Sequence, residues 1–179
     1  MPLPIDMKKN PAFKIALAAI LCAQALALSF LEGQLPPMPM LPPGAKPGFS
    51  NIITMFAAGS LGLPWALTVA VIKGAFAFIT RGFTASLMSL SGGILSAAAM
   101  WLLLKTAKEK LGLMGISMIC AICHNAGQLA AAALITGTGK IVYYAPALII
   151  FGLLTGAVTG VIFRAVMPAL EKQKKYLFR

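Results

Sequence analysis

The sequence predicts an all-α integral membrane protein with six transmembrane helices. Of its 179 residues, 59% are hydrophobic and only 11% are charged, whereas soluble domains carry about 25% charged residues. The basic residues, which give a net charge of +11, stand in short clusters between long apolar runs and form no continuous basic patch. The composition therefore excludes a soluble catalyst and a nucleic-acid-binding protein.

Six apolar stretches are the predicted spans. The first, residues 12–31, is about 20 residues long, which is enough to cross the hydrocarbon of a bilayer. The others are 51–63, which is short, 64–80, 92–104, 112–136 and 141–167. The chain then divides into a cytoplasmic N-terminus (1–11), a single transmembrane domain (12–168) and a basic cytoplasmic tail (169–179).

Basic residues give the predicted orientation, because cytoplasmic loops carry an excess of lysine and arginine. Six spans that start inside leave only Lys46, Arg81 and Lys140 on the outer side. A five-span alternative, which merges 51–63 with 64–80, separates the two basic ends and is less consistent with this rule. The inner residues are Lys8, Lys9, Lys14, Lys105, Lys108, Lys110, Arg164, Lys172, Lys174, Lys175 and Arg179.

Small residues recur at every fourth position in the first and last spans. They are Ala19, Ala23 and Ala27 in the first, and Gly152, Gly156 and Gly160 in the last. This spacing lets helices approach closely. It also favours a membrane helix over the alternative for residues 12–31, a signal peptide cleaved near Ala23-Gln24-Ala25.

Residues 32–50 predict a long extended loop. They carry six prolines and three glycines, which prevent a regular helix. Long loops of this kind often cover a binding site, so we call residues 32–50 the lid loop. A second polar connection is expected at 81–91, and the turn at 137–140 leads into the last span.

Lys73 stands near the middle of the third predicted span. A charged side chain at the bilayer centre costs at least ~2.5 kcal/mol, so it needs water, a partner or a ligand. One alternative is a lysine that snorkels or pairs with a backbone carbonyl. The other is an anion site with Arg81, Lys46 and the helix start expected at Ser91, where free N–H groups favour an anion.

A second polar cluster, His124, Asn125 and Gln128, lies in the fifth predicted span. His124 and Gln128 share a helix face. Such residues serve as hydrogen-bonding contacts between helices or as ligand contacts, and both alternatives stay open. Glu32, at the outer end of the first span, is expected to pair with Lys46 or Arg81 or to contact a ligand.

No catalytic, cofactor or metal motif is expected to operate in this chain. The run Cys120-Ala121-Ile122-Cys123-His124 matches the C-x-x-C-H pattern of haem attachment. Haem attachment needs an exposed, non-helical segment, and this run lies inside an apolar span. Paired carboxylates, nucleotide-binding loops and aspartate-rich diphosphate motifs are missing from the sequence. Any ATPase that drives transport must then be another chain.

The sequence also resembles a family of small bacterial membrane proteins. The residues that carry the resemblance are Glu32, the loop 41–51, Lys73, the run 89–96 with Met100, and His124-Asn125-Ala126-Gly127-Gln128. The chain resembles the Gx transporter or heptaprenyl diphosphate synthase component I family, which is related to the substrate-binding S components of energy-coupling factor (ECF) transporters. The resemblance covers nearly the whole chain.

This resemblance implies an S-component-like bundle in the bacterial cytoplasmic membrane. The lid loop would cover an outward-facing pocket for a small, anionic or amphipathic ligand. The pocket residues would be Glu32, Lys46, Asn51, Lys73, Arg81, Ser91, His124, Asn125 and Gln128. Ala19, Ala23 and Ala27 would dock on a membrane coupling subunit driven by two ATPases.

Two other functions stay open. One is an accessory membrane subunit of heptaprenyl diphosphate synthase in the isoprenoid synthesis of the menaquinone side chain. The other is a structural membrane protein without a ligand.

Overall fold

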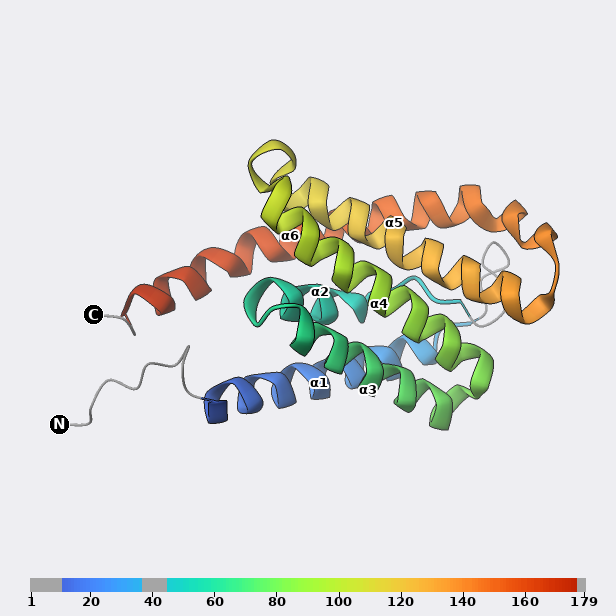
Figure 1. Ribbon diagram of the computed structural model, residues 1–179, viewed down its shortest axis with the longest axis horizontal. Coiled ribbons are helices and arrows are strands. Elements are labelled where there is room, and N and C mark those ends of the chain that lie inside the picture. Colours follow the sequence, from blue (N-terminus) through green and yellow to red (C-terminus); the bar gives the residue numbers. More distant parts are fainter. Residues whose placement is uncertain (1–10, 37–44, 177–179) are drawn as a thin grey trace.

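The computed structural model describes the backbone of residues 11–36 and 45–176, with side chains up to residue 165. The predicted N-terminus 1–11 and the tip of the lid loop therefore lie almost entirely outside the described residues, as do the side chains of the predicted tail. The described chain is all-helical and forms one bundle (Figure 1). Its α-helices are α1 (Pro11–Gly33), α2 (Asn51–Ser60), α3 (Leu63–Arg81), α4 (Phe83–Thr106), α5 (Lys108–Thr136) and α6 (Ala145–Tyr176).

The predicted number of six spans is not confirmed. In the described part of the chain, five helical segments are long and apolar enough to cross a membrane. The exception is α2, which has 10 residues. At 1.5 Å per residue it spans only ~15 Å, about half of the hydrocarbon thickness. Its shortness follows from the sequence, because Gly62 and Pro64 end the helical run soon after residue 60.

The first and last described helices nevertheless have their outer ends at the same end of the bundle. Figure 1 shows the start of α1, the end of α6 and the turn that joins α4 to α5 all at this end. The return is made by the end of the lid loop followed by α2. A Cβ on Gly59, near the end of α2, would lie 3.4 Å from Leu104, near the end of α4. The described end of the lid loop and the short helix α2 thus together run along the bundle in the place where a second span was expected.

The prediction of a polar connection at residues 81–91 is wrong. Helix α4 begins at Phe83, and the only break is Gly82, whose φ of 87° is easy for glycine. Two serines of this stretch, Ser86 and Ser91, are accommodated in the helix because their hydroxyls donate to carbonyls. Ser86 Oγ donates to the carbonyl of Gly74 at 2.9 Å. The helix start expected at Ser91 is therefore also wrong, since Ser91 lies two turns inside α4.

The remaining boundaries differ less from the prediction. Helix α5 begins four residues early, but Gly112 has non-helical angles (φ 61°, ψ 175°), so the regular helix starts there, as expected. A 3₁₀-helix, Gly139–Tyr144, precedes α6. The helical backbone of α6 continues to Tyr176, so no helix end marks the boundary predicted at residue 168.

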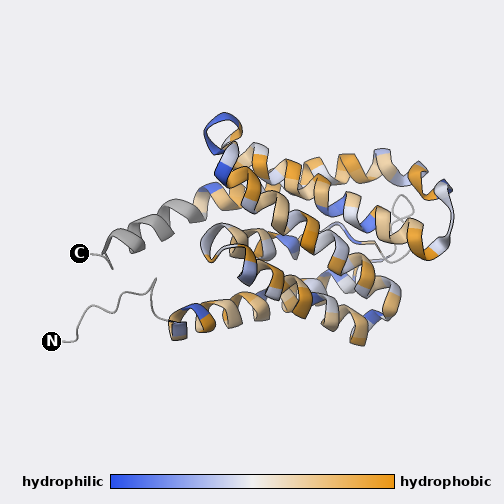
Figure 2. Ribbon diagram, in the orientation of Figure 1, coloured by the Kyte–Doolittle hydropathy of each residue, from blue (hydrophilic) through white to orange (hydrophobic). Residues whose placement is uncertain are grey.

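Glycines let α5 and α6 pack closely, as their spacing predicts. A Cβ on Gly156 would lie 2.5 Å from the Cα of Met118, and one on Gly160 would lie 2.8 Å from the Cα of Met114. Hydrophobic residues predominate along the helices (Figure 2). Each long helix exposes large hydrophobic side chains, among them Ile20, Ile79, Leu102, Leu134 and Val161. A surface of this kind is stable against lipid.

Candidate functional site

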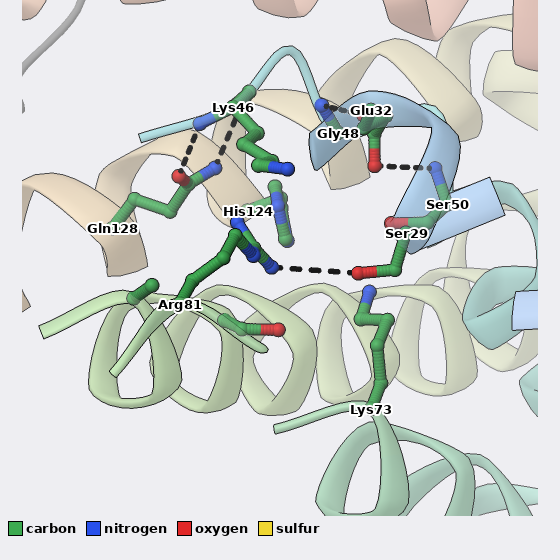
Figure 3. Close-up of a pocket in the computed structure, with 11 residues that line it drawn as sticks. Ser29, Glu32, Lys46, Gly48, Ser50, Lys73, Arg81, His124 and Gln128 are labelled. Carbon is green, nitrogen blue, oxygen red and sulfur yellow. Dashed lines mark hydrogen bonds between the residues drawn. The ribbon is translucent and has the colours of Figure 1, made fainter. Parts of the chain in front are cut away.

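A small polar cavity lies under the described end of the lid loop, where α1, α3, α4 and α5 meet (Figure 3). Its volume is about 20 Å³, which is room for one or two water molecules. Only alanine and glycine interrupt a lining that is otherwise polar or charged. The lining residues are Ser29, Glu32, Lys46, Gly48, Ser50, Lys73, Arg81, Ala85, Ser89, His124 and Gln128.

Three cationic side chains point into this cavity, one from the lid loop and two from α3. Lys46 comes from the lid loop, Lys73 from the middle of α3 and Arg81 from its end (Figure 3). Lys73 is only 1% exposed. The ammonium nitrogens of Lys46 and Lys73 are buried without a hydrogen-bond partner among the described residues. Buried ammonium groups normally have such partners, so this cluster is energetically costly without a ligand.

Arg81 is only weakly held. Its Nη2 donates to the hydroxyl of Ser29 at 3.4 Å, near the limit for a hydrogen bond. Within the described residues, most of the guanidinium donors of Arg81 therefore have no acceptor.

The carboxylate of Glu32 binds the backbone of the lid loop. Its Oε1 accepts hydrogen bonds from the N–H groups of Gly48 at 2.8 Å and Phe49 at 2.6 Å, and its Oε2 accepts one from Ser50 at 3.2 Å. Gly48 has a φ of 90°, which glycine adopts without strain. The expected pairing with Lys46 or Arg81 is thus replaced by an anchor that fixes the end of the loop.

Gln128 anchors the same loop from the opposite side. Its Oε1 accepts a hydrogen bond from the backbone N–H of Lys46 at 3.1 Å, and its Nε2 donates to the Lys46 carbonyl at 3.2 Å. The side-chain amide of Gln128 thereby pairs with both backbone groups of Lys46, as a neighbouring β-strand would. Together, Glu32 and Gln128 bring the Lys46 side chain over the cavity.

Lys46 lies outside the membrane-spanning helices. Burial, with a smaller effect from the nearby Arg81 charge, lowers the pKa of the Lys46 ammonium from 10.5 to about 8, and Glu32 partly opposes this shift. Lys46 is therefore still largely protonated at neutral pH.

His124 lies between two glycines and lines the cavity together with Lys73. A Cβ on Gly48 would lie 3.0 Å from its Cδ2, and a Cβ on Gly92 would lie 2.7 Å from its Nδ1. Helix α4 separates α3 from α5, and its glycines allow close approach on both sides. A Cβ on Gly93 would lie 3.1 Å from the Cβ of Ala70 on α3. These contacts explain how residues of α3 and α5 reach one cavity.

Comparison with known proteins identifies the family. A family model described as heptaprenyl diphosphate synthase component I matches residues 21–166. The chain belongs to that family. No curated protein matches the chain significantly. A solved structure described as the S component of a bacterial ECF transporter is similar to it, with 18% sequence identity and a TM-score of 0.70, over 93% of this chain and 99% of the other.

This family member therefore has the fold seen in that S component. The similarity and the five apolar helices make it a multi-pass membrane protein of the predicted class. In the described part of the chain, no group of three or more His, Cys, Asp or Glu side chains is placed to hold a metal ion.

Three of the residues predicted for the pocket lie elsewhere in this family member. Asn125 donates to the carbonyl of Leu148 at 2.7 Å and so joins α5 to α6. Ser91 donates to the carbonyl of Gly127 at 2.9 Å, which joins α4 to α5. Both form contacts between helices. Asn51 accepts a hydrogen bond from Ser96 at 2.9 Å and does not line the cavity.

The remaining predicted residues lie at two places. Glu32, Lys46, Lys73, Arg81, His124 and Gln128 all line the cavity. The alanines Ala19, Ala23 and Ala27 lie exposed on α1. Cys120 and Cys123 are free, and the C-x-x-C-H run is continuous helix within α5.

The sequence interpretation missed three serines of the cavity, Ser29, Ser50 and Ser89. Ser29 stands three residues before Glu32 on α1, so the helical spacing alone places both on one face. Ser89 was missed because the region around it was expected to be a connection between helices.

Proposed function

We propose that this protein is the membrane-embedded substrate-binding component of an ECF-type uptake transporter and that it captures a small anionic ligand from the outer side. The observation that carries the proposal is the pair of buried ammonium groups, Lys46 and Lys73, that have no partner in the described structure. A bound anion would offset their desolvation. Its access would be controlled by the lid loop, which closes the cavity through Glu32 and Gln128.

The orientation of the chain supports capture from outside. The cavity lies at one end of the bundle, and the basic turn with Lys105, Lys108 and Lys110 lies at the other (Figure 1). Basic clusters favour the cytoplasmic side. We therefore place the lid loop on the outer side of the cytoplasmic membrane and both chain termini inside.

The exposed alanines of α1 support a partner in the membrane. Ala19, Ala23 and Ala27 leave a shallow strip on the surface of the bundle, where another helix can approach closely. In the proposed transporter this strip docks on a coupling subunit, and separate ATPase chains supply the energy. The similar solved structure is itself an S component of an ECF transporter, which makes this partner the natural one to test.

The family description favours a second candidate, an accessory subunit that associates with a heptaprenyl diphosphate synthase. The described cavity offers neither aspartate clusters nor room for a prenyl chain, so this candidate assigns it no role. In that case the chain would recruit a soluble synthase to the membrane.

Affinity purification of the tagged chain from its natural host tests the proposal. Gently solubilised membranes should yield a coupling subunit and ATPases with the wild-type chain. Replacing Ala19, Ala23 and Ala27 with leucine should remove these partners, whereas Lys73→Met should retain them. Leucine at Ile20, which is 56% exposed on the neighbouring face of α1, is the control and should change nothing.

Recovery of a soluble prenyl synthase without ATPases would replace the transport proposal with the accessory-subunit alternative. Recovery of the same partners from the leucine variant would contradict the assigned docking strip.

A further inference from the structure

The net charge of the side chains around the cavity indicates how many charges the ligand carries. With both lysines protonated, Lys46, Lys73 and Arg81 contribute three positive charges. Glu32 is the only acidic side chain in the lining, and its oxygens already accept three backbone hydrogen bonds. The lining thus retains two net positive charges, which a monoanion would only half neutralise.

The size of the cavity indicates how those charges are distributed. A cavity of about 20 Å³ has room for only one or two water molecules, so any larger anion enters only if the side chains around it move. The flexible ends of the two lysine side chains line this space (Figure 3). A compact group can enter if these ends move aside and then bind its oxygens. A compact dianion needs the smallest movement of these side chains, so we expect both negative charges to lie on a single small group.

The donors match a tetrahedral oxyanion. Ammonium groups approach from the lid loop and from α3, and the guanidinium of Arg81 approaches from the end of α3. Ser89 and His124 complete a lining with polar groups from several directions. Guanidinium and ammonium groups are the usual partners of phosphate oxygens.

We propose that the ligand presents one tetrahedral dianionic group of the phosphate type to Lys46, Lys73 and Arg81. This assignment rests on the proposed capture function and specifies its substrate class. The rest of the ligand is small or polar, because Ala85 is the only apolar side chain in the lining. A long prenyl chain has no place inside this cavity.

Sulfate and methanesulfonate form a matched pair of probes, because both have a tetrahedral sulfur centre and they differ by one charge. Isothermal titration calorimetry of the solubilised wild-type chain at neutral pH and fixed ionic strength should show that sulfate binds at least about tenfold more tightly than methanesulfonate. Inorganic phosphate should behave like sulfate. Succinate, which carries its two charges on separate carboxylates, should bind more weakly than sulfate.

The Lys73→Met variant removes one positive charge and should reduce the preference for sulfate over methanesulfonate toward equal affinity. Lys46→Met should do the same and provides an independent test outside the helices. Lys140→Met is the control, because Lys140 is exposed and does not line the cavity. Thermal unfolding of each variant verifies that it is folded.

Equal binding of sulfate and methanesulfonate by the wild-type chain, tighter binding of succinate, or no binding of any probe would overturn the dianion assignment. The first two results would leave the capture function standing. Failure to recover a coupling subunit would instead remove the capture function, while a sulfate preference would still support the anion site.

Discussion

The bundle has an apolar half, around the main hydrophobic core, and a polar half, around the cavity. The same helices run through both halves, and they bury apolar side chains in one and polar or charged side chains in the other. On α3, Val69 and Lys73 are both only 1% exposed. Val69 belongs to the main apolar core, with Leu21 of α1 and Ile116 of α5, whereas Lys73 lines the cavity one turn later. Helix α5 changes in the same way between Cys120 and His124. Burial alone therefore does not distinguish a packing residue from a site residue.

The two halves differ in the kind of buried polar group that lacks a hydrogen-bond partner. The apolar half needs no partners for its methyl and thiol groups, and its two unpartnered hydroxyls, on Thr54 and Ser117, carry no charge. The cavity half leaves two ammonium groups without partners. An unpartnered charge costs far more than an unpartnered hydroxyl. In the cavity half, the unpartnered ammonium groups lower the stability of the ligand-free fold, which supports the proposed binding of an anion there.

The largest expected effects come from substitutions one turn apart on α3. Without an anion, Lys73→Met should stabilise the protein by about 1–4 kcal/mol, because an apolar side chain replaces a buried charge. Val69→Ala should destabilise it by about 1–3 kcal/mol, because it leaves a cavity in the core. Thermal unfolding in detergent measures both. A destabilised Lys73→Met variant would show that Lys73 already has a stabilising partner.

Close packing of α5 on α6 gives the next effect. Gly156→Ala should destabilise the protein by about 1–3 kcal/mol, because the new methyl would meet the backbone of Met118. Gly139→Ala is the control, since a Cβ there meets no atom within 4 Å, and its effect should stay within about 0.5 kcal/mol. Equal melting temperatures of the two variants would contradict this account of the α5–α6 contact.

The anchor of the lid loop gives a smaller, local effect. Glu32→Gln should weaken the hydrogen bonds to Gly48, Phe49 and Ser50 by about 1.5 kcal/mol, because they lose a charged acceptor. Hydrogen exchange of these amides should then accelerate by roughly tenfold. Glu109→Gln, at an exposed site in the first turn of α5, should leave their exchange unchanged. Unchanged exchange in Glu32→Gln would show that Gln128 alone holds the loop.

The pH dependence of Lys46 gives the smallest effect. Its folded-state pKa of about 8 is below the ordinary value. Its charge therefore destabilises the ligand-free fold at neutral pH, and this penalty is relieved as the pH rises from about 8 toward 10.5. Acylation of Lys46, followed by peptide mass spectrometry, should show a midpoint near 8 that moves upward when sulfate binds. A midpoint that sulfate leaves unchanged would argue against an anion beside Lys46.

Much of the architecture is readable from the sequence, because apolar runs and glycine spacing act locally. The regular start of α5 at Gly112 and the close packing at Gly156 were predicted in this way. The start of α4 was not, because serines usually indicate a connection. In this bundle Ser86 and Ser91 donate to carbonyls within helices or across them, so the helix tolerates their hydroxyls.

The site was predicted only in part for a similar reason. Charge and burial pointed to Lys73, and helical spacing joined His124 to Gln128. Nothing in the sequence distinguishes Asn125, which joins α5 to α6, from its neighbour His124. The role of Glu32 as an anchor of the loop depends on a backbone conformation at Gly48, which only the folded chain reveals.

The most direct test of the central claim is native mass spectrometry of the chain, gently solubilised from its natural host, beside its Lys73→Met variant. The wild-type chain should carry a small anionic molecule, which tandem fragmentation releases and identifies, and the variant should carry none. A wild-type chain without any small molecule, or the same molecule at the same occupancy on both chains, would contradict that claim.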